Sequence, residues 1–336
     1  MKAYEVVKGC TSLDGLRLTE RADPRPGPHE VLIRVRAASL NYRDHMVVIG
    51  RYFGGAVDRD TIPLSDGAGE VVAVGDRVTR FGVGARVAGT FFQVWKDGPR
   101  SGWSPALGVP LDGMLTELVV LHEDGVVAVP SHLSFEEAAA LPCAGVTAWN
   151  ALMVAGGSIK PGSTVLCLGT GGVSTFGVQF AKAAGARVIV ISSSDAKLQR
   201  AVRLGASDGI NYQTTPEWDK EIAKLTGGRG VDAVIEIGGA GTLARSFQSI
   251  AFGGKVCLIG FLAGPGDTSP QALMMRGGSL QGIGVGSTRM FEDMNRAIEV
   301  NGLKPAIDRV YPFEQAPDAF RQLESRDFVG KIVISI

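Results

Sequence analysis

The chain has 336 residues, enough for two domains that each bury a core of their own. Hydrophobic residues make up 45% and charged residues 20%, and 34 basic side chains balance 34 acidic ones. This balance, without a basic block, gives no support to binding of nucleic acid or of a membrane surface. The first residues lack the apolar core of a signal peptide, and no apolar run reaches ~18 residues. We therefore expect a cytoplasmic globular protein.

The four cysteines, Cys10, Cys143, Cys167 and Cys257, lie far apart in the sequence. A structural zinc site needs clustered ligands, and a disulfide needs an oxidising compartment. Cys167 and Cys257 lie inside apolar runs typical of strands, which favours buried, inert thiols. We expect no cysteine-based chemistry.

Residues 1–122 consist of short apolar runs separated by glycine, proline and aspartate. The runs expected to form strands are EVLIRVRAASL, GEVVAVG, ARVAGTF and TELVVLHEDGVVAVP. Short strands separated by turns are typical of an all-β, partly closed barrel.

The pattern changes after residue 122. Ser134 and Glu137 fit a capping box that opens the helix FEEAAAL, which Pro142 interrupts. Further on, the predicted strands are STVLCLG, ARVIVIS, DGINY, VDAVIEIGG, GGKVCLIG and a candidate sixth, SLQGIGVG. The helices between them are VSTFGVQFAKAAG, AKLQRAVRLG, PEWDKEIAKLTGG and TLARSFQSI. This alternation predicts a parallel sheet with helices on both faces over residues 123–289.

Residues 290–336 leave the alternation. They contain most of a helix expected at 289–300, a second helix at 316–325 and the strand KIVISI. We place this stretch back on the first domain.

A glycine-rich loop follows the strand VLCL directly and opens a helix. Gly169 permits the tight turn, and Gly171 and Gly172, with Val173 behind them, let backbone N–H groups approach a pyrophosphate at the helix N-terminus. Ser174 replaces the third glycine of the usual fingerprint, which should slightly loosen the packing of helix on strand. The strand–loop–helix–strand context predicts a doubly wound dinucleotide-binding (Rossmann) fold, and a glycine turn without a ligand is the alternative.

No acid follows at the position that would hold the ribose 2′-hydroxyl of NAD, about 20 residues further on. That position is Ser192, followed by Ser193 and Ser194. Serine hydroxyls can donate to a 2′-phosphate, Lys197 can add a positive charge, and Tyr212 can add a hydroxyl. Helix-capping serines, a solvated lysine and a packing tyrosine are the alternatives. Their occurrence together favours NADP(H).

Several motifs in order resemble the medium-chain dehydrogenase/reductase superfamily over essentially the whole chain. They are DGAGEVVAVG, AAALPCAGVTAW, GTGGV, QFAKAAGA and GKIVISI. The resemblance implies an α/β protein with a GroES-like, partly closed β-barrel catalytic domain (1–122, completed by 290–336) and a Rossmann domain (123–289). Homodimers or homotetramers are common in such proteins.

Zinc alcohol dehydrogenases of this superfamily carry a cysteine, a Gly-His-Glu segment and a third ligand. Here the corresponding positions hold Asn41, Ser65 and Asp66, and only Cys143 matches a ligand. One thiolate cannot hold a catalytic zinc. The four-cysteine structural lobe is missing too. The resemblance therefore implies the zinc-free branch, similar to quinone oxidoreductases and enoyl reductases, and no metal site.

Without a metal, a quinone or an α,β-unsaturated carbonyl is a better hydride acceptor than an unactivated alcohol is a donor. We expect Asn41 to lie beside the nicotinamide and donate a hydrogen bond to cofactor or substrate; a turn residue is the alternative. Tyr52 is the candidate for orienting substrate or donating a proton, with a packing tyrosine as the alternative. For Arg43 a solvated or salt-bridged residue is favoured over a substitute for the metal, and His45 receives no role.

The resemblance implies further cofactor contacts: Thr147 beside the nicotinamide, Gly238 and Gly239 at its ribose, Gly260 and Phe261 at its carboxamide, and Lys331 at the pyrophosphate. We also hypothesise that the loop at residues 95–105 borders the substrate entrance; a plain surface loop is the alternative.

These observations predict an NADPH-dependent oxidoreductase that transfers hydride to an activated C=C bond or a quinone without catalytic zinc. Its partner would be a small carbonyl, enone or quinone. The alternatives are a zinc-independent alcohol dehydrogenase or carbonyl reductase, and an NADPH-binding protein without turnover.

Overall fold

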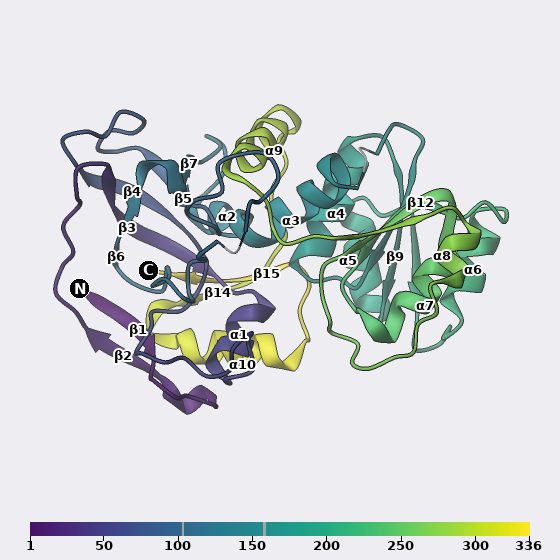
Figure 1. The fold of residues 1–336 in the computed structure, drawn as a ribbon, viewed down its shortest axis with the longest axis horizontal. Helices are drawn as coiled ribbons and strands as arrows, with labels where there is room; N and C mark the ends of the chain where they lie inside the picture. Colours follow the sequence, from purple (N-terminus) through teal and green to yellow (C-terminus); the bar gives the residue numbers. More distant parts are fainter. Residues whose placement is uncertain (103, 157–158) are drawn as a thin grey trace. The chain divides into compact units, whose positions relative to one another are not determined.

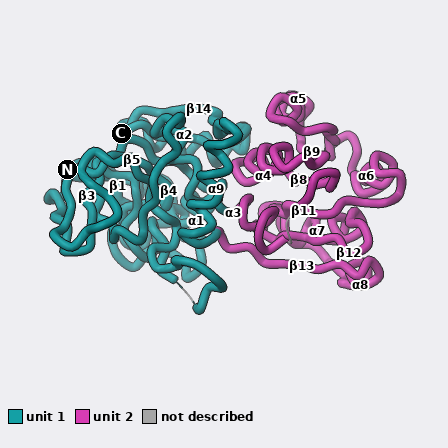
Figure 2. Tube along the Cα trace, turned by 90° about the horizontal axis from the view of Figure 1, so that it is seen from above, with its two compact units in different colours: residues 1–146, 286–336 teal, residues 147–285 magenta. Residues whose placement is uncertain are grey.

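A computed structural model describes residues 1–102, 104–156 and 159–336. The chain divides into two compact units, coloured separately in Figure 2. Unit 1 comprises Met1–Val146 and Gly286–Ile336, and unit 2 comprises Thr147–Val285. Among the described residues, no helix has both the length and the apolarity needed to cross a bilayer.

The main sheet of unit 1 is mostly antiparallel and has the order β14-β15-β3-β4-β5-β7, with β6 paired to β3 (Figure 1). Its strands are β3 (Glu30–Ser39), β4 (Asp66–Val74), β5 (Arg86–Gly89), β6 (Leu118–His122), β7 (Val126–Ala128), β14 (Ile307–Pro312) and β15 (Lys331–Ser335). Strands β1 (Lys2–Val6) and β2 (Leu16–Glu20) pair separately. In β3 the buried Val31, Ile33 and Val35 alternate with more exposed residues, the period-two pattern of a strand with one face on a core. The predicted β domain is confirmed.

Short helices connect these strands. They are η1 (Leu13–Gly15), α1 (Tyr42–Val48), η2 (Glu123–Gly125), α2 (Phe135–Ala139), η3 (Leu141–Gly145), α9 (Thr288–Asn301), η5 (Phe313–Gln315) and α10 (Ala316–Ser325). As expected, Ser134 caps α2, and its Oγ accepts the N–H of Glu137. Pro142 lies within η3, a π-helical turn that follows α2 directly.

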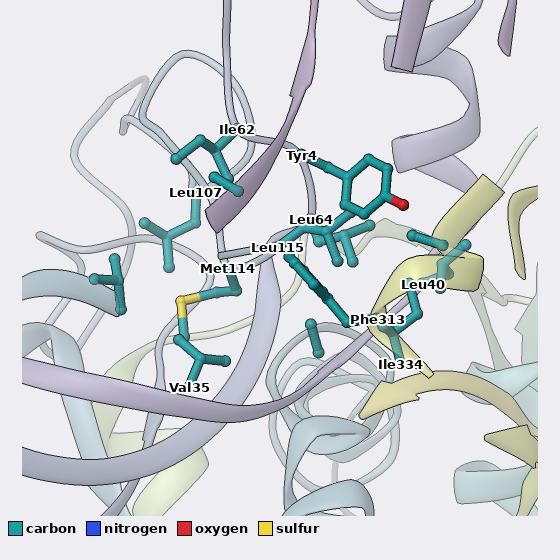
Figure 3. Packing of buried hydrophobic residues seen from close by; sticks show 14 of the residues in the cluster. Tyr4, Val35, Leu40, Ile62, Leu64, Leu107, Met114, Leu115, Phe313 and Ile334 are labelled. Atoms are coloured by element: carbon teal, nitrogen blue, oxygen red, sulfur yellow. The ribbon is translucent and has the colours of Figure 1, made fainter. Parts of the chain in front are cut away.

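The core of unit 1 draws on both ends of the chain. Figure 3 shows Leu64 and Leu115 packed in one cluster with Phe313 and Ile334. Tyr4, from the first strand, meets the Phe313 ring edge-on at 5.2 Å between centroids. Residues after 286 therefore complete this unit because they supply part of its apolar interior.

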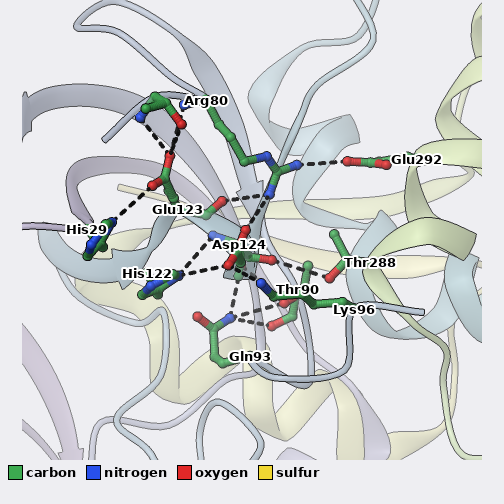
Figure 4. Close-up of polar contacts among 12 residues, drawn as sticks. His29, Arg80, Thr90, Gln93, Lys96, His122, Glu123, Asp124, Thr288 and Glu292 are labelled. Carbon is green, nitrogen blue, oxygen red and sulfur yellow. Dashed lines mark hydrogen bonds and ion pairs between the residues drawn. The ribbon is translucent and has the colours of Figure 1, made fainter. Parts of the chain in front are cut away.

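A polar network around η2 attaches the residues after 122 to unit 1 (Figure 4). The Glu123 carboxylate accepts the backbone N–H groups of Thr79 at 2.8 Å and Arg80 at 2.9 Å, which hold the pKa of Glu123 below its ordinary range. The Arg80 guanidinium donates to the Glu123 carbonyl and to the Glu292 carboxylate, both at 2.8 Å. Thus η2 is joined to the loop before β5 and to α9.

This network bears on the domain boundary. The first domain was expected to end at residue 122, whereas unit 1 continues to Val146. The reason is that β7 pairs with β5, and α2 packs on β3 and β4. The sequence predicts an apolar strand and a capped helix in this region. It does not show that they attach to the sheet of the first unit.

Unit 2 is a parallel sheet with the order β10-β9-β8-β11-β12-β13. Its strands are β8 (Thr164–Leu168), β9 (Arg187–Ser192), β10 (Asp208–Asn211), β11 (Val231–Glu236), β12 (Ile250–Leu258) and β13 (Ser279–Gly282). Its helices are η4 (Asn150–Val154), α4 (Gly172–Ala183), α5 (Asp195–Leu204), α6 (Trp218–Leu225), α7 (Ala240–Ser249) and α8 (Gln271–Met275), and α3 (Val146–Trp149) begins one residue before the unit. The predicted Rossmann fold is confirmed.

The strand order of unit 2 reverses at β8. The chain passes from β8 to β9 and β10 on one side, then returns to β11 on the other. In an open parallel sheet, ligands bind outside the carboxyl ends of the strands at this switch point. The loops that follow β8, β9, β11 and β12 are therefore where a ligand of unit 2 is expected.

Candidate functional site

The loop after β8 has the geometry of an anion-binding helix N-terminus. Gly169 has φ +74°, a left-handed conformation that favours glycine. Gly171 is the N-cap of α4 and provides no side-chain cap, and no heavy atom lies within 4 Å of where its Cβ would stand. The space beside Gly171 is therefore open at the start of α4, whose first-turn N–H groups include those of Gly172 and Val173. This arrangement fits a pyrophosphate.

Ser174 has the opposite effect to the one expected from sequence. It is 1% exposed, and its Oγ donates to the carbonyl oxygen of Leu168 at 2.5 Å, so it ties α4 to β8. Helix and sheet also approach closely at Gly177, where an added Cβ would stand 2.3 Å from Cδ1 of Ile235. Gly177 lies outside the positions of the glycine fingerprint, so that pattern does not mark it.

Strands β9 and β10 end side by side. Their register pairs Ser192 with Asn211, and the N–H of Tyr212 donates to the Ser192 carbonyl at 3.0 Å. Ser192 is buried and Tyr212 is 37% exposed. Ser193 follows directly, and Lys197 lies in the first turn of α5. The structure thus brings the predicted 2′-phosphate residues to one edge of the sheet.

An acid that the sequence analysis passed over lies at the same edge. Asp195 is the first residue of α5, where the helix dipole favours a carboxylate, and it accepts the Asn211 side-chain N–H at 2.8 Å. Its position, two residues after Ser193, could have been read from the sequence. The ends of β9 and β10 therefore carry hydroxyl groups, a lysine and one carboxylate, and the carboxylate already accepts a hydrogen bond from Asn211.

A buried carboxylate shapes the loop after β11. Glu236 is fully buried and accepts the N–H groups of Gly238 at 2.7 Å and Gly239 at 3.1 Å, together with the hydroxyl of Thr242 at 2.6 Å. The hydroxyl of Ser246 donates to its other oxygen. In the sequence, Glu236 stands out as an acid at the end of the apolar strand VDAVIE. That signal was available, but Glu236 was not among the predicted site residues.

The predicted nicotinamide contacts gather near this loop. Gly239 is close to the strand that follows: an added Cβ would stand 2.9 Å from the carbonyl oxygen of Gly260 and 3.0 Å from the Cα of Phe261. Phe261 is 68% exposed, whereas Thr147, in α3, is 3% exposed. Gly238, Gly239, Gly260 and Phe261 are therefore neighbours at the carboxyl ends of β11 and β12.

A second cluster of polar side chains lies in unit 1, at the N-terminus of α1. The N–H of Asn41 donates to Asp44 at 2.8 Å, and its Oδ1 accepts from the Lys331 ammonium at 2.5 Å. Its Nδ2 lies 3.4 Å from the Ser65 hydroxyl oxygen. Asn41 thus begins a helix and also belongs to a side-chain network.

Lys331 lies at the centre of this network. It is 3% exposed, and its ammonium donates to the carbonyl oxygen of Leu40 at 2.7 Å and lies 3.5 Å from Asp66. Asp66 in turn accepts the Ser65 hydroxyl at 2.7 Å and the N–H of Cys143 at 3.1 Å. The pyrophosphate contact predicted for Lys331 would require its ammonium to leave these oxygens of unit 1.

Arg43 and Asp44 form the other charged pair of the cluster. Their side chains lie 3.2 Å apart, and the guanidinium lies 4.8 Å from the ring centroid of Tyr52 and 4.9 Å from that of Phe91. Burial raises the pKa of Asp44 to about 6, although the neighbouring Arg43 opposes the rise. Arg43 is salt-bridged, one of the two states favoured from sequence. Tyr52 is connected to Asn41 indirectly: its ring packs on Arg43, Arg43 pairs with Asp44, and Asp44 accepts the N–H of Asn41.

The donor set of this cluster does not fit a catalytic zinc. The residues at the family's ligand positions are an amide, a hydroxyl, one carboxylate and the Cys143 thiol, whose pKa burial and the nearby Asp66 raise well above its ordinary value. Zinc binds the thiolate and prefers nitrogen and sulfur ligands. The charge of Lys331 already lies beside Asp66 and Asn41. In the described part of the chain, no three His, Cys, Asp or Glu side chains are grouped to hold a metal.

The loop at residues 95–105 is attached to α9. The carbonyl oxygen of Trp95 accepts the N–H of Thr288 at 2.9 Å, and that of Lys96 accepts the N–H of Arg289 at 3.0 Å. Trp103 lies outside the described residues. The entrance role stays a prediction.

The two units match known families. Residues 27–131 match the alcohol dehydrogenase GroES-like domain, and residues 172–300 match the zinc-binding dehydrogenase family. A zinc-type alcohol dehydrogenase-like protein of Schizosaccharomyces pombe is 42% identical, over 99% of each chain. The quinone oxidoreductase of Sus scrofa is 30% identical over 93% of this chain and 91% of its own. The crystal structure of an NAD-dependent alcohol dehydrogenase superposes with a TM-score of 0.92 at 33% identity, covering 100% of both chains.

A GroES-like β domain joined to a Rossmann domain defines a class of oxidoreductases that use nicotinamide cofactors. The chain belongs to the medium-chain dehydrogenase/reductase superfamily, which confirms the resemblance found in its sequence.

Proposed function

We propose that this oxidoreductase uses NADPH to reduce an activated C=C bond or a quinone without a catalytic zinc. The observation that carries the proposal is the cluster of Asn41, Ser65 and Asp66, at the positions where the family resemblance places metal ligands, together with the buried Lys331 that contacts Asn41 and Asp66. Such a cluster offers hydrogen-bond donors rather than a Lewis acid, which suits a substrate whose negative charge is delocalised.

The reaction with an enone consists of one hydride and one proton transfer. When held by the loops after β8 and β9, NADPH would supply the hydride that an enone accepts at its β-carbon, which leaves negative charge on the carbonyl oxygen. The Nδ2 of Asn41 donates to the developing oxyanion. A proton then adds to the α-carbon, and the product is a saturated ketone. Tyr52 is the proposed group for delivering or relaying that proton, since its ring lies 4.8 Å from the guanidinium of Arg43, which pairs with Asp44 at the start of α1.

The preference for NADPH is the finer part of the proposal. Ser192, Ser193, Lys197 and Tyr212 support it because hydroxyls and a cation suit a 2′-phosphate. Asp195 and the NAD-dependent relative argue for the other cofactor. We expect Ser192→Asp to lower kcat/KM for NADPH about 10-fold or more while kcat/KM for NADH is retained, because a carboxylate repels the phosphate. The matched control is Ser207→Asp, which adds the same charge before β10. An unchanged cofactor ratio in Ser192→Asp would remove the serine argument.

Product analysis tests the reaction itself. The protein is incubated with NADPH and an enone, a quinone and an aldehyde in turn, and its metal content is measured on the same sample. A saturated ketone supports the proposal. An allylic alcohol would instead assign C=O reduction, the alternative that the names of the alcohol dehydrogenase relatives favour. Stoichiometric zinc in the active protein would overturn the zinc-free mechanism.

A further inference from the structure

The side chain of Lys331 is buried in unit 1 and touches Asn41, the proposed donor to the substrate. From this contact we infer that Lys331 is a positioning residue: its ammonium fixes the orientation of the Asn41 carboxamide and polarises it, so that the amide N–H donates to the oxyanion. The inference rests on the proposed function and adds a residue to it.

The orientation follows from the chemistry of the two groups. An ammonium carries donors and no acceptor, so the amide atom that faces it at 2.5 Å is the oxygen of Asn41. The amide nitrogen must then point away from Lys331. It carries two hydrogens, and the Ser65 oxygen, at a long 3.4 Å, accepts at most one of them. The other is the hydrogen that we assign to a substrate oxygen.

The polarisation follows from burial. A cation at the amide oxygen draws electron density from the nitrogen and strengthens its N–H donors, and the effect is large where water is excluded. Lys331 is 3% exposed and Asp66 is fully buried, so little solvent screens this charge. A neutral side chain at position 331 would leave the amide an ordinary donor.

The charge is kept in place by the rest of the cluster. A buried ammonium is costly unless it is paired, and Asp66, 3.5 Å away, is its counter-ion. Asp66 is itself fixed by the Ser65 hydroxyl and by the N–H of Cys143. Ser65, Asp66 and Cys143 lie at positions where the family resemblance places zinc ligands. The protein thus carries its own cation there, on strand β15.

The test uses a charge-balanced variant, Lys331→Met with Asp66→Asn. Removing both charges avoids an unpaired carboxylate, so the variant should fold, as measured by circular dichroism and thermal unfolding. We expect kcat for the enone to fall about 10²-fold, the scale of losing one oxyanion donor, while KM for NADPH stays within about twofold. The matched control is Lys224→Met with Glu221→Gln, which removes a surface ion pair of the same type, 2.8 Å long, on α6. It should leave both constants unchanged.

A double-mutant cycle with Asn41→Ala distinguishes positioning from a merely structural role. If Lys331 acts through Asn41, the charge-balanced change should cost little further in the Asn41→Ala background, because the group that it orients is gone. Losses that multiply would overturn the inference. So would a charge-balanced variant that raises KM for NADPH at unchanged kcat, which indicates the pyrophosphate contact, or one that fails to fold.

The two proposals fail separately. Wild-type protein that turns over nothing on the substrate panel contradicts the proposed function, and the inference falls with it. Wild-type protein that reduces the enone, with multiplicative losses in the cycle, contradicts the inference alone.

Discussion

Asp44 is the residue whose environment most affects its chemistry. Its carboxylate is 1% exposed and accepts the N–H of Asn41 at the start of α1. Burial favours the protonated form, whereas Arg43 and the amide favour the charged one, and the pKa of about 6 reflects that competition. Asp44 therefore titrates close to neutral pH.

This pKa predicts a pH-dependent contribution to stability. Because an exposed carboxyl titrates near pH 3.9, the folded protein binds the Asp44 proton more tightly than the unfolded chain does. The contribution of Asp44 is fully present below about pH 4 and is lost as the pH rises through about 6. Relative to Asp44→Asn, the wild type should therefore lose about 1–3 kcal/mol of unfolding free energy between about pH 4 and 7.

Urea unfolding of both proteins across that range measures the effect. Asp318→Asn, which removes an exposed carboxylate of α10, is the control for the change of net charge. If the unfolding free energies of the wild type and Asp44→Asn differ by the same amount at every pH, the prediction of a raised pKa for Asp44 is wrong.

At the scale of elements, α4 packs closely on β11 in unit 2. Gly177 lies in the middle of α4, and its missing Cβ leaves room for Ile235, which is fully buried. Alanine would favour the helix by about 1 kcal/mol. Overpacking against Cδ1 of Ile235 costs about 1–3 kcal/mol, so sterics should win.

We predict that Gly177→Ala destabilises the protein and that Ile235→Val rescues it. Valine lacks Cδ1, the atom that the new methyl group meets at 2.3 Å. The double variant should be more stable than the sum of the two single changes by about 1 kcal/mol or more, measured by urea unfolding. Additive single effects would refute the overlap. Ile189→Val, another fully buried isoleucine of this sheet, is the control that should not rescue Gly177→Ala.

The elements themselves were largely predictable. Helix α10 spans Ala316–Ser325, as its amphipathic pattern predicts, and the strands of unit 2 match the predicted apolar runs. Helix α1 was missed because Asn41–Asp44 was taken as a site motif, although an Asn followed three residues later by Asp is also a helix start signal. Strand β14 and helix α8 were missed because IDRVYP and QALMM are short and lack clear periodicity.

At the scale of the whole molecule, strand β13 ends the sheet of unit 2. All four of its residues are exposed, and Leu280 is 42% exposed. Nearby α8 carries Met274 and Met275, which are 71% and 66% exposed. An edge strand with apolar neighbours is a template for pairing with another chain.

We predict that the chain forms a homodimer or higher oligomer through this edge. Leu280→Lys should convert it to a monomer, because the added charge would be buried in the new interface, and light scattering after size-exclusion chromatography measures the mass. Val300→Lys, at an 86% exposed position of α9, is the control and should not change the mass. A monomeric wild type, or a Leu280→Lys variant that remains associated, would contradict this assignment.

The candidate site was only partly predictable, for reasons of distance along the chain. The glycine loop and the serines after β9 were found because a local pattern of strand, turn and helix carries them. Asn41 was found through resemblance. Its contact with Lys331 joins residues 290 positions apart, and no local pattern reports such a pairing. Glu236 and Gly177 were missed because their roles depend on which strands and helices pack together.

That separation has a consequence during synthesis on the ribosome. At about 5–20 residues per second, strand β15 is made roughly 15–60 s after Asn41, so Asp66 is also synthesised well before the ammonium that pairs with it. Strand β15, which pairs with β3 and β14, therefore joins the sheet of unit 1 late in synthesis and brings the Lys331 ammonium to Asp66.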